Sequence, residues 1–188
     1  MSRFAMRSAA GSAALALALA FLAAPAAHAQ RTAQRPEESF GFRGIGARAG
    51  LVDPEGASST ITFGVHADLG EFIPNLRITP LVEYWSVGVS GFDRSDLLLA
   101  ANVDWEFPLV GPKVTPYAGG GLGVHRLRAD RPSPFSDYSN TRLGLHVQGG
   151  LRDEVMPNLS LFGELRFTFV EQADNFKLLG GFTYNFIY

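Results

Sequence analysis

The stretch LSLFGELRFTF, residues 159–169, alternates apolar and polar side chains with a period of two. Leu161 and Phe167 fall on one face of an extended chain, and Glu164 and Arg166 fall on the other. An amphipathic helix would instead repeat its apolar residues every three or four positions. The stretch therefore predicts a β-strand with one apolar face and one charged face.

The same period recurs from Phe40 onward. Eight stretches carry it: 40–52, 60–69, 76–86, 96–106, 113–126, 142–152, 159–169 and a last segment that ends at 188. Pro74, Pro108 and Pro157 lie in three short connections between these stretches. Eight short strands joined as successive hairpins close most simply into an antiparallel up-and-down barrel, because closure removes the exposed sheet edges. We predict an all-β, eight-stranded barrel.

The composition narrows the class of barrel. The chain of 188 residues is 46% hydrophobic. Beyond the N-terminus its longest apolar run is Leu97–Ala101, well short of the roughly 18–20 residues of a membrane helix. A soluble lipocalin-like barrel would place its apolar face inward, and a transmembrane barrel would place it outward. Charged and glycine residues share the polar face, no helical segment follows the last stretch, and strands of about 10–13 residues suit a tilted bilayer span. These features favour a transmembrane β-barrel.

Charge and cysteine content exclude several classes. With 16 basic and 18 acidic residues, the chain is not a strongly basic nucleic-acid binder. Because it has no cysteine, it cannot carry a disulfide framework, a thiolate metal site or the acylated thiol of a lipoprotein.

The N-terminus has the pattern of a cleavable signal peptide. Arg3 and Arg7 precede an apolar segment at 13–23, and a small-x-small cleavage site follows at Ala27 and Ala29, before Gln30. We expect a signal peptide at 1–29, a short polar lead-in at 30–39 and the barrel at 40–188. Export across the inner membrane follows from this prediction.

Two motifs carry a resemblance to a known family. The final stretch FTYNFIY, 182–188, resembles the C-terminal strand of bacterial outer-membrane barrels, and TPYAGGGLG, 115–123, resembles a strand of OmpX-like and OmpA-type eight-stranded barrels. The resemblance implies a location in the outer membrane, surrounded by its lipids and lipopolysaccharide. It also implies that the barrel assembly machinery reads alternate aromatic residues of the last strand: Phe182, Tyr184, Phe186 and Tyr188.

The polar face predicts a filled lumen, because eight strands enclose only enough space for side chains. Pairing the strands about the proposed turns places Asp68 opposite Arg77, Arg77 opposite Asp104, and Glu106 opposite Lys113. This arithmetic predicts an acid–base ladder near the periplasmic end. The expected lumen network comprises Arg48, Asp68, Arg77, Asp104, Glu106, Lys113, His146, Glu164 and Arg166.

The same register gives large side chains small neighbours. Tyr117 falls opposite Gly150, and His146 falls opposite Gly121 and within reach of Glu164. Such a network can serve as a satisfied polar plug or as a path for protons or ions. We favour the plug, because buried charges need partners in any case.

The residues give little support for catalysis. Lipid A deacylases of the outer membrane resemble this chain in length, and Tyr138-Ser139-Asn140 resembles part of their motif, but Asp137 stands where the histidine should be. His66 and His146 fall on the lumen face and His125 near a strand end, so no outward nucleophile–base pair is expected. No cluster has metal-ligand spacing. We expect no enzyme activity, cofactor or metal.

The function expected from these features is structural or surface-interacting. An unidentified surface ligand would contact the longer connections at 87–95 and 127–141. A narrow channel for ions or small solutes is the alternative, and a lipid A-modifying enzyme or a soluble lipocalin-like carrier are weaker ones. No nucleic-acid partner is expected.

Overall fold

The computed structural model describes residues 40–89, 92–109, 113–130, 138–171 and 173–186. The predicted signal peptide, its cleavage site and the lead-in lie outside these residues. The strands are β1 Gly44–Pro54, β2 Thr60–Asp68, β3 Glu71–Ile73, β4 Leu76–Val89, β5 Phe92–Glu106, β6 Val114–Asp130, β7 Tyr138–Met156, β8 Leu159–Val170 and β9 Asn175–Asn185. In the described part of the chain, no helix is long and apolar enough to cross a membrane.

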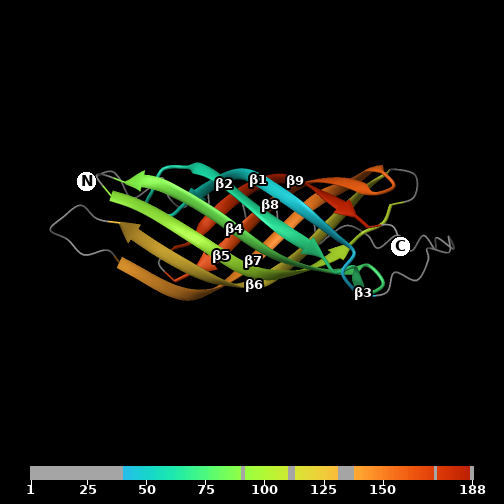
Figure 1. Ribbon diagram of the computed structural model, residues 1–188, viewed down its shortest axis with the longest axis horizontal. Helices are drawn as coiled ribbons and strands as arrows, with labels where there is room; N and C mark the ends of the chain where they lie inside the picture. Colours follow the sequence, from blue (N-terminus) through green and yellow to red (C-terminus); the bar gives the residue numbers. More distant parts are fainter. Residues whose placement is uncertain (1–39, 90–91, 110–112, 131–137, 172, 187–188) are drawn as a thin grey trace, which may run out of the picture. The chain divides into compact units, whose positions relative to one another are not determined.

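The strands form a closed antiparallel ring (Figure 1). Each long strand pairs with its neighbours in sequence, β1 pairs with β9 along its whole length, and β2 pairs with β4. The three-residue β3 is an extension paired only with β4, so eight long strands make the barrel. The predicted eight-stranded up-and-down topology is confirmed, and β3 is an addition within the connection expected at 70–75.

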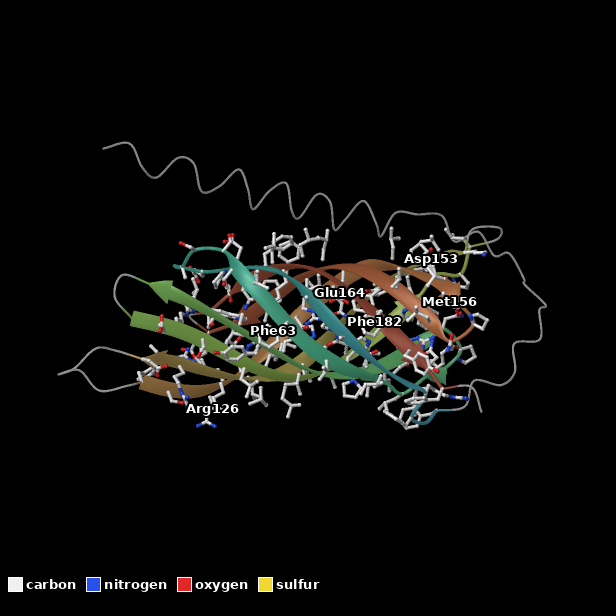
Figure 2. All side chains as sticks on the ribbon, turned by 45° about the horizontal axis from the view of Figure 1, so that its top comes forward. Phe63, Arg126, Asp153, Met156, Glu164 and Phe182 are labelled. Carbon is white, nitrogen blue, oxygen red and sulfur yellow. The ribbon has the colours of Figure 1, made fainter. Side chains whose placement is uncertain are left out.

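The barrel is apolar outside and polar inside. Leu143, Leu122 and Ile61 are 80%, 66% and 66% exposed, whereas Arg166 and Lys177 are fully buried. Phe63 and Phe182, labelled in Figure 2, are exposed on the outer wall, and Glu164 is buried within the barrel. The two-residue period of the strands produces this division, because successive side chains point to opposite faces. It contradicts the lipocalin-like alternative, which requires an apolar interior.

One end of the barrel, here the tight-turn end, carries two similar hairpins. Glu71-Phe72-Ile73-Pro74-Asn75-Leu76 and Glu154-Val155-Met156-Pro157-Asn158-Leu159 share a sequence pattern, and each turns through its Pro-Asn pair. In both hairpins the register shifts just before the turn. Asn75 has a φ of 67°, a left-handed conformation that asparagine tolerates better than most residues. The repeated pattern thus encodes a repeated turn structure.

The opposite end, here the long-hairpin end, differs from the sequence-based expectation. The β4–β5 pairing continues out to Val89 and Phe92, and the β6–β7 pairing continues to Ala129 and Tyr138. Much of the connections expected at 87–95 and 127–141 is therefore hydrogen-bonded strand. The reason is that backbone pairing persists beyond the apolar rows, where side-chain alternation no longer signals a strand.

Small residues set how closely the lumen packs. Gly150 on β7 lies against the ring of Tyr117, and a Cβ added there would come within 2.6 Å of the Tyr117 hydroxyl. Gly163 on β8 faces outward, and a Cβ there would meet nothing within 4 Å.

We therefore expect Gly150→Ala to lower the free energy of unfolding by about 1–3 kcal/mol, because the added methyl group overpacks the lumen. Gly163→Ala is the matched control, and we expect it to be neutral or to stabilise by up to about 1 kcal/mol. Urea unfolding of the two variants in lipid vesicles measures the difference. Equal stability of the two would contradict the close packing at Tyr117.

Candidate functional site: the polar lumen

Glu83, on β4, is the centre of the lumen network. Its carboxylate lies 2.6 Å from Lys177 Nζ, 2.8 Å from Arg166 Nη1 and 3.4 Å from Arg48 Nη1. These cations come from β9, β8 and β1, while β4 itself pairs with β2 and β5. Glu83 therefore reaches across the barrel, and its ion pairs close the middle of the lumen.

Glu164, on β8, is a second carboxylate in the same cluster. It accepts hydrogen bonds from Arg166 Nη2 at 2.6 Å and from the Tyr117 hydroxyl at 2.9 Å. Arg48 Nη1 lies 3.6 Å from it and so faces both carboxylates. Sharing cations in this way offsets the cost of burying several charges, which is high for an isolated ion.

An amide links this cluster to the wall formed by β5. Gln148 Oε1 accepts from Arg166 Nε at 3.0 Å and from Asn102 Nδ2 at 2.8 Å, and its Nε2 donates to Asp104 at 2.6 Å. Asn102 Oδ1 in turn lies 2.6 Å from His146 Nε2. With Asp104 included, three carboxylates face three cations, so the centre of the lumen is balanced in formal charge.

A second cluster lies toward the tight-turn end. Arg77 forms an ion pair with Asp68, and its Nε lies 2.9 Å from Glu106 Oε1. Arg152 completes the group by pairing with Glu106. This is the region in which the sequence predicts an acid–base ladder. Arg77 and Arg152 face Asp68 and Glu106 there, and the buried Glu71 lies opposite Arg77 in register.

The predicted pairing of Glu106 with Lys113 is wrong. Glu106 lies opposite Tyr117, and the Phe107 amide donates to the carbonyl of Pro116 at 2.8 Å. The β5–β6 connection is thus longer than the pairing assumed, which shifts the register and leaves Lys113 exposed outside the lumen. Arg152 takes the place that Lys113 was expected to fill.

Other expected neighbours meet different partners. Arg77 lies opposite Asp104 in register, but the Asp104 side chain accepts a hydrogen bond from Gln148. His146 lies opposite Gly121 and Tyr117 lies opposite Gly150, as the strand register predicted from the sequence requires. His146 bonds Asn102 rather than Glu164. Backbone pairing follows from turn positions, whereas these contacts depend on the choice of rotamer across the lumen.

Several members of the network were missed by the sequence reasoning: Glu83, Asn102, Gln148, Arg152 and Lys177. All occupy inward positions of their strands, so the alternation of inward and outward residues along each strand could have identified them. Their mutual contacts could not be inferred, because Glu83 meets Lys177 and Arg166 only once the sheet has closed.

The half of the lumen nearer the long-hairpin end combines apolar and unpaired polar groups. Leu81, Leu98 and Ala100 form a small apolar cluster level with Glu83, which lies opposite Leu98, and Trp85 is buried farther along β4 toward the long-hairpin end. His125, which the sequence placed near a strand end, lies inside β6, fully buried, with Nδ1 2.7 Å from Asp96 Oδ2. Within the described residues, six buried polar atoms in this half have no hydrogen-bond partner: Trp85 Nε1, Asp96 Oδ1, His125 Nε2, His146 Nδ1, Thr168 Oγ1 and Asn175 Oδ1.

A small cavity lies within the lumen. This cavity, lined by Arg48, His66 and Glu164, among others, offers about 10 Å³ to the centre of a water molecule, roughly enough for a single water. In the part of the chain that the structure describes, no group of three or more His, Asp or Glu side chains could hold a metal ion. The arrangement is that of a plug built from hydrogen bonds and ion pairs.

The aromatic residues of the predicted assembly signal lie at the tight-turn end of β9. Phe182 and Tyr184 are exposed on the outer wall, and the Phe186 ring lies 5.9 Å from that of Tyr184 and 5.4 Å from that of Phe42. Tyr188 lies outside the described residues. Recognition of this strand during assembly stays a prediction.

Loss of the central carboxylate tests the plug. We expect Glu83→Gln to lower the free energy of unfolding by about 3–5 kcal/mol, because it leaves buried cations without a full counter-charge. The control is Glu171→Gln, at a side chain that is 79% exposed and 3.4 Å from Arg142, where we expect a loss of about 0–1 kcal/mol. Urea titration in vesicles compares the two, and a small effect at Glu83 would contradict its central role.

The chain also matches a known protein family. The family model described as the outer membrane protein beta-barrel domain matches residues 13–186. No curated protein matches the chain.

Solved structures share the fold. Neisserial surface protein A is 21% identical, with a TM-score of 0.68 over 79% of this chain and 100% of that chain. The N-terminal β-barrel domain of Pseudomonas aeruginosa OprF is 13% identical, with a TM-score of 0.56 over 78% and 99%. Ail, the attachment invasion locus protein of Yersinia pestis, solved with the heparin analogue sucrose octasulfate, is 15% identical, with a TM-score of 0.55 over 79% and 100%. These likenesses show the fold, and the family model, which covers nearly the whole chain, shows the family: the chain belongs to the outer-membrane β-barrel domain family.

Proposed function

We propose that this small outer-membrane barrel is closed to ions and solutes and serves as a rigid support for surface contacts made at its long-hairpin end. The observation that carries the proposal is the set of ion pairs from Glu83 to Arg48, Arg166 and Lys177. These pairs join opposite walls of the barrel and fill its middle with buried side chains.

The long hairpins supply the surface for interaction. In barrels of this kind the short turns face the periplasm and the longer connections face the outside. β6 and β7 remain paired for about five residues beyond the outward apolar residue Val124, or roughly 16 Å along the strand. The Ail structure contains a heparin analogue, which is an observation on that protein and offers a precedent for ligand binding by this fold.

The proposal includes the absence of catalysis. Ser139, the serine of the deacylase-like motif, is exposed on β7. The histidines that the structure describes, His66, His125 and His146, are all buried in the lumen. A nucleophilic serine requires a base within hydrogen-bonding reach. On the described outer wall, Ser139 has no histidine base.

A narrow channel is the second candidate, and the unpaired polar atoms near His125 and Thr168 favour it. Buried polar groups of this kind are commonly satisfied by internal water. Water in the half of the lumen nearer the long-hairpin end would still meet the ion pairs of Glu83 before reaching the other end, so the closed barrel is the stronger proposal.

Conductance separates the two candidates. We expect the full barrel in a planar bilayer to give no stepwise current above that of the bare membrane, because buried ion pairs block the lumen. A folded Arg166→Ala/Lys177→Ala variant, which shortens two of the blocking side chains, should give current steps and serves as the control. Regular current steps from the unaltered protein would favour the channel.

The export signal has its own test. We expect protein isolated from the outer membrane to have the intact mass of residues 30–188, because cleavage follows the small residue at Ala29. Ala29→Arg should block cleavage and retain the mass of residues 1–188. A full-length mass for the unaltered protein would contradict a removable signal.

A further inference from the structure

The outer wall changes character in rows toward the long-hairpin end. Backbone pairing aligns outward residues of β5, β6 and β7 in successive rows. The rows are Leu99–Val124–Leu143, then Leu97–Arg126–Thr141, then Ser95–Arg128–Ser139, and last the acidic pair Asp93–Asp130. An apolar wall thus gives way to a cationic and hydroxylated band two rows high, here called the arginine band, and then to carboxylates.

Both arginines are available to a ligand. Arg126 and Arg128 are exposed, and within the described residues neither side chain forms an ion pair or hydrogen bond. Figure 2 shows Arg126 pointing away from the barrel wall. Because the two residues are separated by one inward residue, their Cα atoms lie roughly 7 Å apart on the same face.

No other described cation has this placement. Arg48, Arg166 and Lys177 are buried in the lumen, where Arg77 and Arg152 also pair with carboxylates. Arg94 and Arg142 donate to the backbone carbonyls of Glu55 and Glu171. Arg43 and Lys113 lie at the tight-turn end. Elsewhere the outer wall carries aromatic pairs instead, such as Phe63 and Tyr84, with ring centres 5.7 Å apart.

The chemistry of the arginine band suits phosphate. Guanidinium groups bind phosphate oxygens through paired, charge-assisted hydrogen bonds. Ser95 and Ser139 flank Arg128, and Thr141 flanks Arg126, so hydroxyl donors stand beside each cation. The apolar row directly below, with Leu143 80% exposed, offers a surface for acyl chains.

We infer that Arg126 and Arg128 bind the phosphorylated headgroup of a lipid in the outer leaflet, with its acyl chains lying against Leu99, Val124 and Leu143. The inference rests on the proposed outward orientation of the long-hairpin end. A soluble polyanion fits less well, because it would approach from the rim past the carboxylates of Asp93 and Asp130. A membrane lipid reaches the arginine band from the side, where the apolar wall holds it.

The test compares two probes on the full barrel in detergent micelles, bisphosphorylated lipid A and the same lipid with both phosphates removed. Binding is counted by native mass spectrometry. We expect the phosphorylated lipid to bind roughly tenfold or more tightly, as two charge-assisted contacts would give. Arg126→Gln/Arg128→Gln should abolish this preference, and each single variant should weaken it. Lys113→Gln, which removes an exposed cation at the other end, should leave it unchanged.

Three results would overturn the inference: equal binding of both lipids by the unaltered protein, an unchanged preference in the double variant, or displacement of lipid A by an equal concentration of soluble sucrose octasulfate. Heat-modifiable migration in gels verifies that each variant is folded. A barrel that conducts ions could still prefer phosphorylated lipid, and a closed barrel could lack that preference. Failure here is therefore distinguishable from failure of the proposed function.

Discussion

The burial of Glu83 is the interaction on which the interior depends. A carboxylate that is 1% exposed must be matched by cations, and Lys177, Arg166 and Arg48 approach it from strands far away in the chain. Those cations can be buried only because Glu83 and its neighbour Glu164 are there. Each charge therefore requires the others, and closure of the ring brings them together.

Steric space imposes the second constraint. An eight-stranded barrel has room for side chains and little else. Large inward groups are accommodated where the opposing strand carries glycine, as Tyr117 is by Gly150 and His146 is by Gly121. The glycine content of the chain is thus partly a consequence of a polar lumen packed across adjacent strands.

The composition of the outer wall depends on the surrounding membrane and not on packing within the lumen. Its apolar rows match the hydrocarbon region, and its composition changes where the strands continue beyond that region. At that edge the wall carries aromatic rings on one side of the barrel, such as Phe63, and the exposed Arg126 and Arg128 on another. The two sides of the barrel are therefore chemically distinct, although the backbone pairing is regular throughout.

The sequence by itself determined the eight long strands, their order and which residues share a face, because a period of two is a local property of the chain. The charged and glycine residues of the polar face then indicated that this face lines the lumen. The sequence placed Glu164 and Arg166 on the inward face and Phe182 on the outward face. It also located both Pro-Asn turns through their repeated pattern. The sequence-based prediction failed at Lys113 and at the outer ends of the long hairpins. There the alternation of apolar and polar side chains does not indicate which backbone residues are paired.

Only the tertiary structure decided which inward residues touch. The meeting of Glu83 with Lys177 depends on closure of the sheet and on the register of every intervening pair, so no local pattern contains it. Likewise the arginine band exists because pairing aligns Ser95, Arg128 and Ser139 from three strands. Local alternation fixes the direction of a side chain, and long-range hydrogen bonding between strands fixes its neighbours.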